Sequence, residues 1–219
     1  MIPTKPYAAT DLGIFRFLDG KLLVYLVELK IEPFVGRYSL PGTLVLETED
    51  LEAAVRRAYR EATGRSSAYF EQVYTFSAID RDPRRRTIST AYMGFPDRPG
   101  EPFEPVDKYR TGEWFYVNDT PSLAYDHNEI LKVCTDRIAA KLNYTNIALL
   151  LLPGEFTMAE LQCVYEQGLG EKLESGSFSD KVLSLGMIEV TGGERPAENA
   201  PPVPLYRAAH RELQEIPFI

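Results

Sequence analysis

Two residue types that often carry chemistry are scarce in this sequence, which contains two cysteines and two histidines. Cys134 and Cys163 do not form a CxxC pair, and the two histidines do not complete a zinc ligand pattern. The sequence therefore indicates neither a disulfide framework nor a metal site, and we expect no bound cofactor. Both cysteines are expected to be small buried side chains.

Long hydrophobic runs are also missing. The longest, at residues 147–153, falls far short of the roughly 20 apolar residues that span a bilayer. The first residues, MIPTKPYAATD, lack the basic stretch and apolar stretch of a secretion signal. We therefore expect a cytoplasmic protein that has no membrane partner.

Positive charge is in deficit, because 24 lysines and arginines stand against 32 acidic residues and give a net charge of -8. This balance argues against indiscriminate adhesion to nucleic acid, although it is compatible with a local basic face. The 219 residues, 44% of them hydrophobic, are sufficient for one large or two small domains with a buried core.

Strand patterns dominate the first half of the chain. Residues 9–18 and 21–29 are mostly apolar and β-branched, and they flank Asp19 and Gly20, a dipeptide favoured in type I′ hairpin turns. Further strands with aromatic and β-branched residues are expected at residues 70–80, 86–95 and 112–118.

A helix is expected between these groups of strands, at residues 50–64. Asp50 is suited to cap its start, and Gly64 is suited to the left-handed conformation that ends a helix. Apolar residues recur at helical spacing, at Leu51, Ala54, Val55, Ala58 and Ala62. The first half is thus predicted to be a mixed sheet with at least one helix.

Helical patterns dominate beyond Pro121, at residues 127–142, 157–170 and 177–186. Pro121 interrupts regular structure, and Asp126 is suited to cap the helix that follows. We therefore predict two domains, residues 1–122 and 123–219, in a protein of the α+β or α/β class.

The last two helices and the residues after them predict a winged helix-turn-helix. Thr157 and Glu160 form a capping box, and the side chains expected to face inward are Leu161, Val164 and Tyr165. The second helix is expected to begin near Ser177, with Asp180 at the matching box position and a packing side of Phe178, Val182, Leu183 and Leu185. Residues 187–207 then predict two short strands around a Gly- and Pro-rich loop, either a wing or a plain hairpin cap.

The segment that includes the first helix resembles the Nudix box, whose pattern is G-x5-E-x7-R-E-U-x-E-E-x-G-U, where U is aliphatic. Aligned on Arg57, Glu61 and Gly64, the opening glycine falls on Thr43 and the middle glutamate on Glu49. The preceding stretch, FVGRYSLPG, resembles the aromatic-x-Leu-Pro-Gly strand of Nudix domains. The alternative is an ordinary amphipathic helix packed on a sheet.

The resemblance implies a Nudix fold without Nudix hydrolysis. Nudix glutamates bind magnesium or manganese beside a diphosphate, and hard cations need several oxygen ligands. Of the three metal-binding glutamate positions that follow the arginine of the box, two are occupied by Ala58 and Ala62, which leaves Glu61 as the one carboxylate at these three positions. We therefore expect the protein not to be an enzyme.

The second half resembles the NrtR-type family of Nudix-related transcriptional regulators. The similarity lies in residues 123–131, 141–170 and 181–192, together with the loop sequence RDPRR at residues 81–85. It implies that the Nudix domain senses a nucleotide or sugar metabolite, commonly ADP-ribose or a relative from NAD metabolism. It also implies a homodimer whose winged helix-turn-helix binds operator DNA.

Candidate residues follow from the chemistry of each ligand. Arginine forks pair with diphosphate oxygens, and a tyrosine can stack on a base. The candidates for effector binding are Arg37, Tyr38, Arg57, Glu61, Tyr74, Arg81 and Arg84, although Arg57 is also suited to a salt bridge with Glu49 or Glu61. The candidates for DNA contact are Lys172, Ser177, Ser179, Lys181, Arg195 and Arg207.

Two other functions remain open at this point. One is a Nudix hydrolase with a relocated metal site, built from Glu47, Glu49, Glu61 and either Asp80 or Asp82. The other is an adaptor that has lost DNA binding, which the charge favours, because residues 127–219 carry eight lysines and arginines against thirteen acidic residues.

Overall fold

The computed structural model describes residues 5–104, 106–197 and 200–216, which form two compact units. The first, here called the sheet unit, is drawn from Met1–Phe15, Leu23–Pro96 and Glu101–Thr135. The second, here called the winged-helix unit, is drawn from Arg16–Leu22, Asp97–Gly100 and Asp136–Ile219. The sequence places the boundary after residue 122, whereas the contacts divide the chain after residue 135, inside a long helix.

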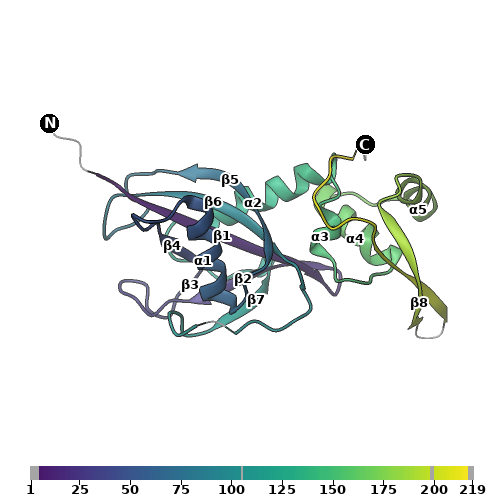
Figure 1. Cartoon of the computed structure of the whole chain (residues 1–219), viewed down its shortest axis with the longest axis horizontal. Coiled ribbons are helices and arrows are strands. Elements are labelled where there is room, and N and C mark those ends of the chain that lie inside the picture. The colour runs from purple at the N-terminus through teal and green to yellow at the C-terminus, as the bar shows by residue number, and fades with distance from the viewer. Residues whose placement is uncertain (1–4, 105, 198–199, 217–219) are drawn as a thin grey trace. The chain divides into compact units, whose positions relative to one another are not determined.

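A mixed seven-stranded sheet forms the body of the sheet unit (Figure 1). Its main path runs β3-β2-β1-β6-β5, in which β1 and β6 are parallel and β5 and β6 are antiparallel. Two short strands lie off this path, because β4 pairs with β1 and β7 pairs with β2. The strands are β1 (Tyr7–Leu18), β2 (Lys21–Glu28), β3 (Tyr38–Ser39), β4 (Gly42–Leu44), β5 (Ala68–Phe76), β6 (Thr87–Pro96) and β7 (Gly112–Tyr116).

The local signals of the first half are confirmed. Asp19 and Gly20 form the turn of the β1-β2 hairpin with φ values of 50° and 72°, as a type I′ turn requires. Helix α1 (Leu51–Thr63) begins after Asp50, whose Oδ1 accepts a hydrogen bond of 2.8 Å from the Ala53 amide. It ends at Gly64, which has a φ of 72°.

Helix α1 packs one face into an aromatic core. Tyr59 is fully buried, and its ring meets that of Phe70 edge-on at 5.3 Å. Ala58 and Ala62 are also fully buried, and Ala62 belongs to the core cluster. Because this face is fixed by packing, the orientation of Arg57 and Glu61 on α1 is fixed as well.

A short 3-10 helix, η1 (Val117–Asp119), precedes helix α2 (His127–Leu142), which occupies the predicted range. Asp126, which the sequence predicts as the cap of α2, accepts hydrogen bonds from Arg81 on both carboxylate oxygens, at 2.8 and 2.7 Å.

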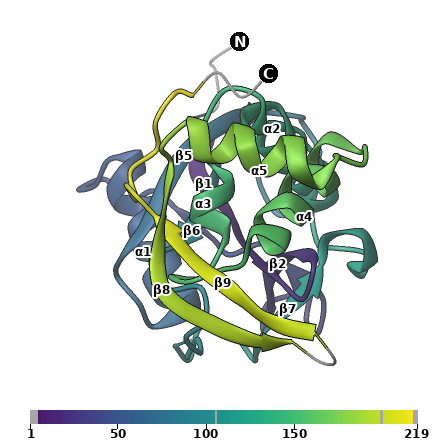
Figure 2. The same cartoon turned by 90° about the vertical axis from the view of Figure 1, so that its right-hand side faces the viewer.

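Among the described residues, the winged-helix unit contains the end of α2, three further helices and a two-stranded ribbon (Figure 2). The predicted capping box is present, since Thr157 Oγ1 accepts from the Glu160 amide and the Glu160 carboxylate accepts from the Thr157 amide. Tyr165 and Phe178 join two of the helices, with ring centroids 5.6 Å apart. The elements are α3 (Ala148–Leu151), α4 (Met158–Leu169), α5 (Ser175–Ser184), β8 (Ile188–Ala197) and β9 (Ala200–Ala208).

The predicted start of α5 is wrong. The helix begins at Ser175 rather than near Ser177, because the Glu174 carboxylate caps it by accepting from the amides of Gly176 and Ser177. The predicted packing side is also too wide. Phe178 and Val182 are buried one turn apart, whereas Leu183 turns away from this stripe and is 49% exposed.

The predicted wing is present, but its strands are longer than expected, with ten residues in β8 and nine in β9. Pro201, Pro202 and Pro204 lie within β9 rather than in a loop. A register shift between Val190 and Glu194 interrupts the pairing. A ribbon of two strands tolerates proline because an N–H that faces its outer edge has no partner strand.

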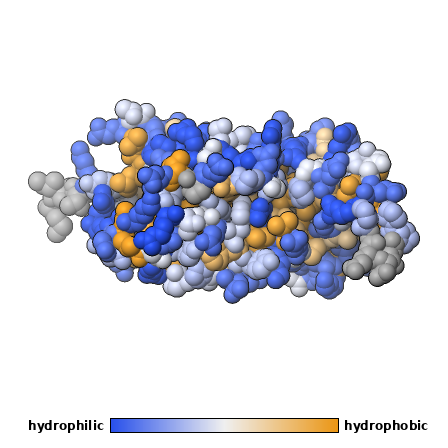
Figure 3. Space-filling model, turned by 90° about the horizontal axis from the view of Figure 1, so that it is seen from below, coloured by the Kyte–Doolittle hydropathy of each residue, from blue (hydrophilic) through white to orange (hydrophobic). Residues whose placement is uncertain are grey.

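None of the described helices combines the length and the apolar character needed to cross a membrane. The face seen in Figure 3 is mainly hydrophilic, with small hydrophobic patches between the polar side chains.

Candidate functional site

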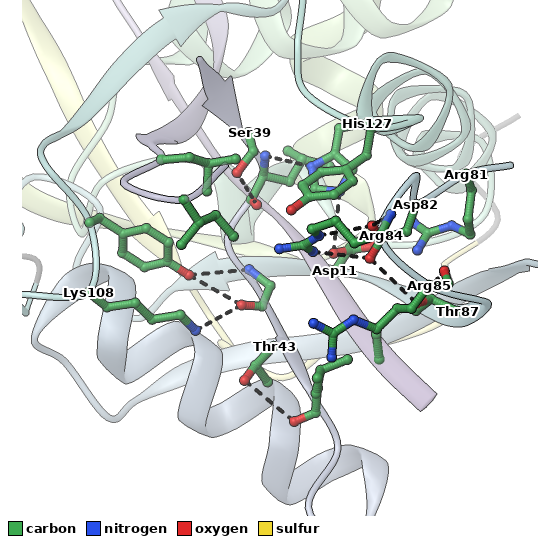
Figure 4. A pocket seen from close by; sticks show the side chains of 18 of the residues that line it. Asp11, Ser39, Thr43, Arg81, Asp82, Arg84, Arg85, Thr87, Lys108 and His127 are labelled. Carbon is green, nitrogen blue, oxygen red and sulfur yellow. Dashed lines mark hydrogen bonds and ion pairs between the residues drawn. The ribbon is translucent and has the colours of Figure 1, made fainter. Parts of the chain in front are cut away.

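A cavity of about 350 Å³ opens in the sheet unit between β1, α1 and the loops that follow β3, β5 and residue 106 (Figure 4). Its wall carries five cationic side chains, those of Arg57, Arg81, Arg84, Arg85 and Lys108. Asp11 and Asp82 are the carboxylates among the described lining residues. The surface that a ligand would meet is therefore electropositive and suits an anion.

Several counter-charges lie behind this surface. Glu49 and Glu61 pair with Arg57, and Asp126 pairs with Arg81, but none of these three carboxylates is among the described residues that line the cavity. The carboxylates thus hold the cations in place from outside the cavity.

Arg57 joins α1 to the loop that begins with β4. Its Nε and Nη2 donate to Glu49 at 3.1 and 2.5 Å, and Nη2 also donates to the Leu44 carbonyl at 2.9 Å. Its Nη1 donates to Thr43 Oγ1 at 2.7 Å and to Glu61 at 3.2 Å. These bonds use all the donors of the guanidinium, so Arg57 fixes the loop rather than presenting a free fork.

Glu61 is held by two cations. Its Oε1 accepts from Arg57, and its Oε2 accepts from Lys108 Nζ at 2.6 Å. Burial raises the pKa of Glu61, but Lys108 and Arg57 together lower it by a larger amount, so the net pKa lies below the ordinary value. Lys108 Nζ also donates to the Gly42 carbonyl at 2.9 Å.

These residues do not fit the divalent cation of the Nudix box. Ala58 and Ala62 supply no oxygen ligand and are buried in the core, and both Glu61 oxygens already bind cationic groups. Nowhere in the described ranges do three or more histidine, cysteine, aspartate or glutamate side chains gather closely enough to hold a metal ion. Of the relocated metal site considered above, Glu49 pairs with Arg57 and Asp82 pairs with Arg84.

A buried charged network forms a further part of the wall. Arg81 Nη2 donates to Asp11 Oδ2 at 2.9 Å, and the Ser89 hydroxyl donates to the same oxygen at 2.7 Å. His127 Nε2 lies 3.4 Å from Asp11 Oδ1, and its Nδ1 accepts from the Leu40 amide at 3.0 Å. Because Nδ1 accepts this bond, it carries no proton, and the imidazole N–H on Nε2 faces Asp11.

The network keeps Asp11 ionised. Burial raises its pKa, but His127, Arg81 and the Ser89 hydroxyl lower it by more, so the net pKa lies well below the ordinary value. The backbone at position 42 approaches the Asp11 carboxylate so closely that only glycine fits there. A Cβ on Gly42, the glycine of the Leu-Pro-Gly sequence, would lie 2.4 Å from Asp11 Oδ1.

Two further arginines and two tyrosines complete the polar and aromatic wall. Arg84 donates from Nε and Nη2 to Asp82, at 3.0 Å each, and its guanidinium lies 5.3 Å from the Tyr125 ring centroid. Arg85 is exposed and lies 4.9 Å above the ring of Tyr7. The cavity therefore offers cations beside the aromatic ring of Tyr125, a combination that suits a phosphate with an attached base.

Four of the seven effector-binding candidates, Arg37, Tyr38, Tyr74 and Glu61, are not among the described residues that line this cavity. Arg37 donates to the Leu123 carbonyl at 2.6 Å, and the Tyr38 hydroxyl donates to Glu113 at 2.9 Å. Tyr74 is 59% exposed and packs against Phe76. Arg57, Arg81 and Arg84 do line it, and Glu61 stands directly behind Lys108.

Some lining residues were missed because their closeness is tertiary. Asp11 lies in a strand and Lys108 in a loop, and neither carries a local motif. Three other lining residues belong to segments that carry the family resemblance, namely Arg85 in RDPRR and Tyr125 and His127 in LAYDH. The sequence therefore held a signal for these residues, although it did not by itself indicate that they line a pocket.

The DNA-contact candidates lie in the winged-helix unit, and three of its cations are already paired. Their partners are Glu166 for Lys172 at 2.5 Å, Glu160 for Arg195 at 2.6 Å and Glu189 for Arg207 at 2.9 Å. Lys181 on α5 is exposed, and no ion pair involves it within the described part of the chain. The Ser177 amide and hydroxyl bind Glu174, and the Ser179 hydroxyl donates to the Ser175 carbonyl at 2.8 Å.

Comparison with known proteins finds relatives for both units. Residues 9–135 match the model of the NUDIX domain, and residues 148–208 match the NrtR DNA-binding winged helix domain. The chain is 30% identical over 223 residues to the “ADPR responsive transcriptional repressor NtrR” of Acinetobacter baylyi, covering 98% of this chain and 85% of that protein.

Two other proteins are similar to this chain, one over its first part and the other over nearly its whole length. An ADP-ribose pyrophosphatase of Methanocaldococcus jannaschii is 36% identical over 127 residues, which cover 58% of this chain and 72% of that enzyme. The crystal structure of Shewanella oneidensis NrtR complexed with a 27mer DNA has a TM-score of 0.78 and 28% identity, covering 92% of this chain and 93% of that chain. The mixed sheet, the helix pair and the ribbon, together with this similarity along almost the full sequence, show that the chain belongs to the NrtR family, in which a Nudix domain precedes a DNA-binding winged helix domain.

Proposed function

We propose that this chain is a transcriptional repressor whose binding to operator DNA responds to ADP-ribose, which it senses without hydrolysis. The proposal rests above all on one observation: a cationic, tyrosine-lined cavity and a winged helix occur in the same chain. The relative from A. baylyi, which is similar over 98% of this chain, is by its name a repressor that responds to ADPR.

The chemistry of the cavity supports a diphosphate with an attached base. Arg84, Arg85 and Lys108 present positive charge, and the half-buried Tyr125 presents aromatic surface. Guanidinium and ammonium groups bind phosphate oxygens through charge-assisted hydrogen bonds, and aromatic rings stack on bases. ADP-ribose contains both groups.

The absence of hydrolysis is supported by the state of Glu61. A glutamate bound by Arg57 and Lys108 is not available to hold an activating metal, and positions 58 and 62 carry alanine. Incubation of ADP-ribose with the protein and magnesium or manganese is expected to give no AMP. Turnover that disappears in Glu61→Gln would instead support the pyrophosphatase function of the M. jannaschii relative.

DNA binding is proposed through a twofold dimer, because two recognition helices about 34 Å apart are needed to read successive major grooves on one face. Light scattering is expected to give the mass of a dimer. A selection of bound genomic fragments, performed with and without ADP-ribose, tests the whole proposal. It should enrich a palindromic site in one condition and lose it in the other.

The adaptor function is distinguished by the same selection. It is favoured by the three ion pairs of Lys172, Arg195 and Arg207, which a phosphate contact would have to compete with. If no site is enriched in either condition but ADP-ribose still binds, the repressor proposal fails and the adaptor function takes its place.

A further inference from the structure

Lys108 occupies an unusual position for a lysine. Its Nζ joins Glu61, which is the remaining glutamate of the three metal-binding positions, to the backbone carbonyl of Gly42 at the start of the box. Its side chain is 37% exposed and lines the cavity, while Glu61 lies behind it. A positive charge is therefore bound to two oxygens in the wall of this cationic cavity.

An ammonium group and a divalent cation share part of their chemistry. Both bind carboxylate and carbonyl oxygens, and both offer positive charge to a phosphate. The ammonium differs in being covalently attached, so it needs neither the additional carboxylates that Ala58 and Ala62 fail to supply nor any exchange with solution.

We propose that Lys108 supplies the positive charge on the diphosphate of the effector that a divalent cation supplies in an intact Nudix box, so that effector binding requires no metal. This inference rests on the proposed function, since it concerns the same cavity. Lys108 contacts the diphosphate, and Arg57 and Glu61 act on the ligand only by positioning the loop and the ammonium.

The arrangement of the wall agrees with this role. In Figure 4, Lys108 lies on one side of the cavity, and Arg81, Arg84 and Arg85 lie on the other. Of the arginines on that side, Arg81 is held by Asp11 and Asp126, and Arg84 is held by Asp82. A diphosphate between the two sides would have cations on both flanks, as a metal and an arginine would provide.

The test is calorimetric titration of ADP-ribose into the purified full chain, once in EDTA and once in magnesium chloride. Lys108→Met and Lys108→Arg are titrated in the same two buffers. Lys5→Met is the matched control, because Lys5 is an exposed lysine of the same unit and is not among the described residues that line the cavity.

The wild type is expected to bind with the same affinity in both buffers. Lys108→Met should weaken binding about tenfold or more in EDTA, since a charge-assisted hydrogen bond is lost. Lys108→Arg should keep most of the affinity, and Lys5→Met should bind like the wild type. Melting curves of all four proteins identify any loss of folding, and the Lys108→Arg protein keeps the test valid if Lys108→Met unfolds.

Binding of the wild type only in magnesium would overturn the inference and leave the proposed function intact. If folded Lys108→Met binds ADP-ribose in EDTA as tightly as the wild type, the inference is also overturned. It is overturned as well if Lys108→Arg loses as much affinity as Lys108→Met. Absence of ADP-ribose binding by the wild type in both buffers would overturn the proposed function and the inference with it.

Discussion

Ala62 shows, at the scale of a single residue, why the Nudix box is not restored by returning its glutamates. Its side chain is fully buried in the core cluster that contains Tyr59. Ala62→Glu is therefore expected to lower the free energy of unfolding by about 3 kcal/mol or more, because it buries an unpaired carboxylate. Urea unfolding measures the loss, and Ala53→Glu on the exposed side of α1 should change stability by less than about 0.5 kcal/mol.

The buried carboxylate of Asp11 leads to a second prediction for a single residue, which concerns how stability depends on pH. Because its pKa is lower in the folded protein than the ordinary aspartate value of about 3.9, its ion pair with Arg81 stabilises the fold fully above that pH and loses its effect as pH falls towards the folded pKa. Asp11→Asn should cost about 3 kcal/mol at pH 7.

The difference between the wild type and Asp11→Asn should stay constant from pH 7 to about pH 5 and shrink below about pH 4. Urea unfolding at each pH checks this. Asp119→Asn, at an exposed position in η1, is the control and should show little difference at any pH. A difference that grows on acidification would contradict the assigned network.

At the scale of the element, the N-terminus of α5 carries an acidic cap. Glu174 accepts from two amides there, and its pKa is lowered by these backbone bonds. Serine makes the same kind of cap without the negative charge. If α5 enters the major groove, Glu174→Ser should keep the fold and tighten DNA binding severalfold, because a repulsion between the carboxylate and the phosphates is removed.

Fluorescence anisotropy with the selected operator measures this change. Glu129→Ser removes the same charge from the exposed first turn of α2 and should leave DNA affinity close to that of the wild type. Weaker binding by a fully folded Glu174→Ser protein would show that the start of α5 does not face the phosphates.

The elements also show which sequence signals carried the fold. The Asp19-Gly20 turn, the Asp50 cap and the Thr157-Glu160 box were predictable because each depends on residues within four positions of one another. The start of α5 was missed because glutamate is not a favoured N-cap residue. The cavity was half predictable, since its arginines belong to motifs, whereas Asp11 and Lys108 reach it only through the pairing of distant segments.

At the scale of the whole molecule, DNA binding should depend weakly on salt. Each phosphate contact contributes a slope of about -0.9 to the plot of log K against log salt. Lys172, Arg195 and Arg207 are paired with carboxylates, so few cations are available to phosphate. Lys181→Ala should therefore weaken binding to all sequences and reduce the slope by about 0.9.

Binding titrations at several salt concentrations test this, with Lys132→Ala, an exposed lysine of α2, as the control. A steep slope in the wild type that Lys181→Ala leaves unchanged would mean that the paired cations exchange their carboxylates for phosphate.

The prolines of β9 have a consequence for how the protein behaves when it is concentrated. A two-stranded ribbon has two outer edges, and any part of an edge that is left open is a template on which strands of other molecules can add. On the outer edge of β9, Tyr206 pairs with Phe156, and Pro204 and Pro202 follow at two-residue spacing on that same edge, where they have no N–H to offer to such a strand. The register shift after Val190 also interrupts the pairing within the ribbon. The wing is thus protected against edge-to-edge aggregation by the same residues that make its sequence look like a loop.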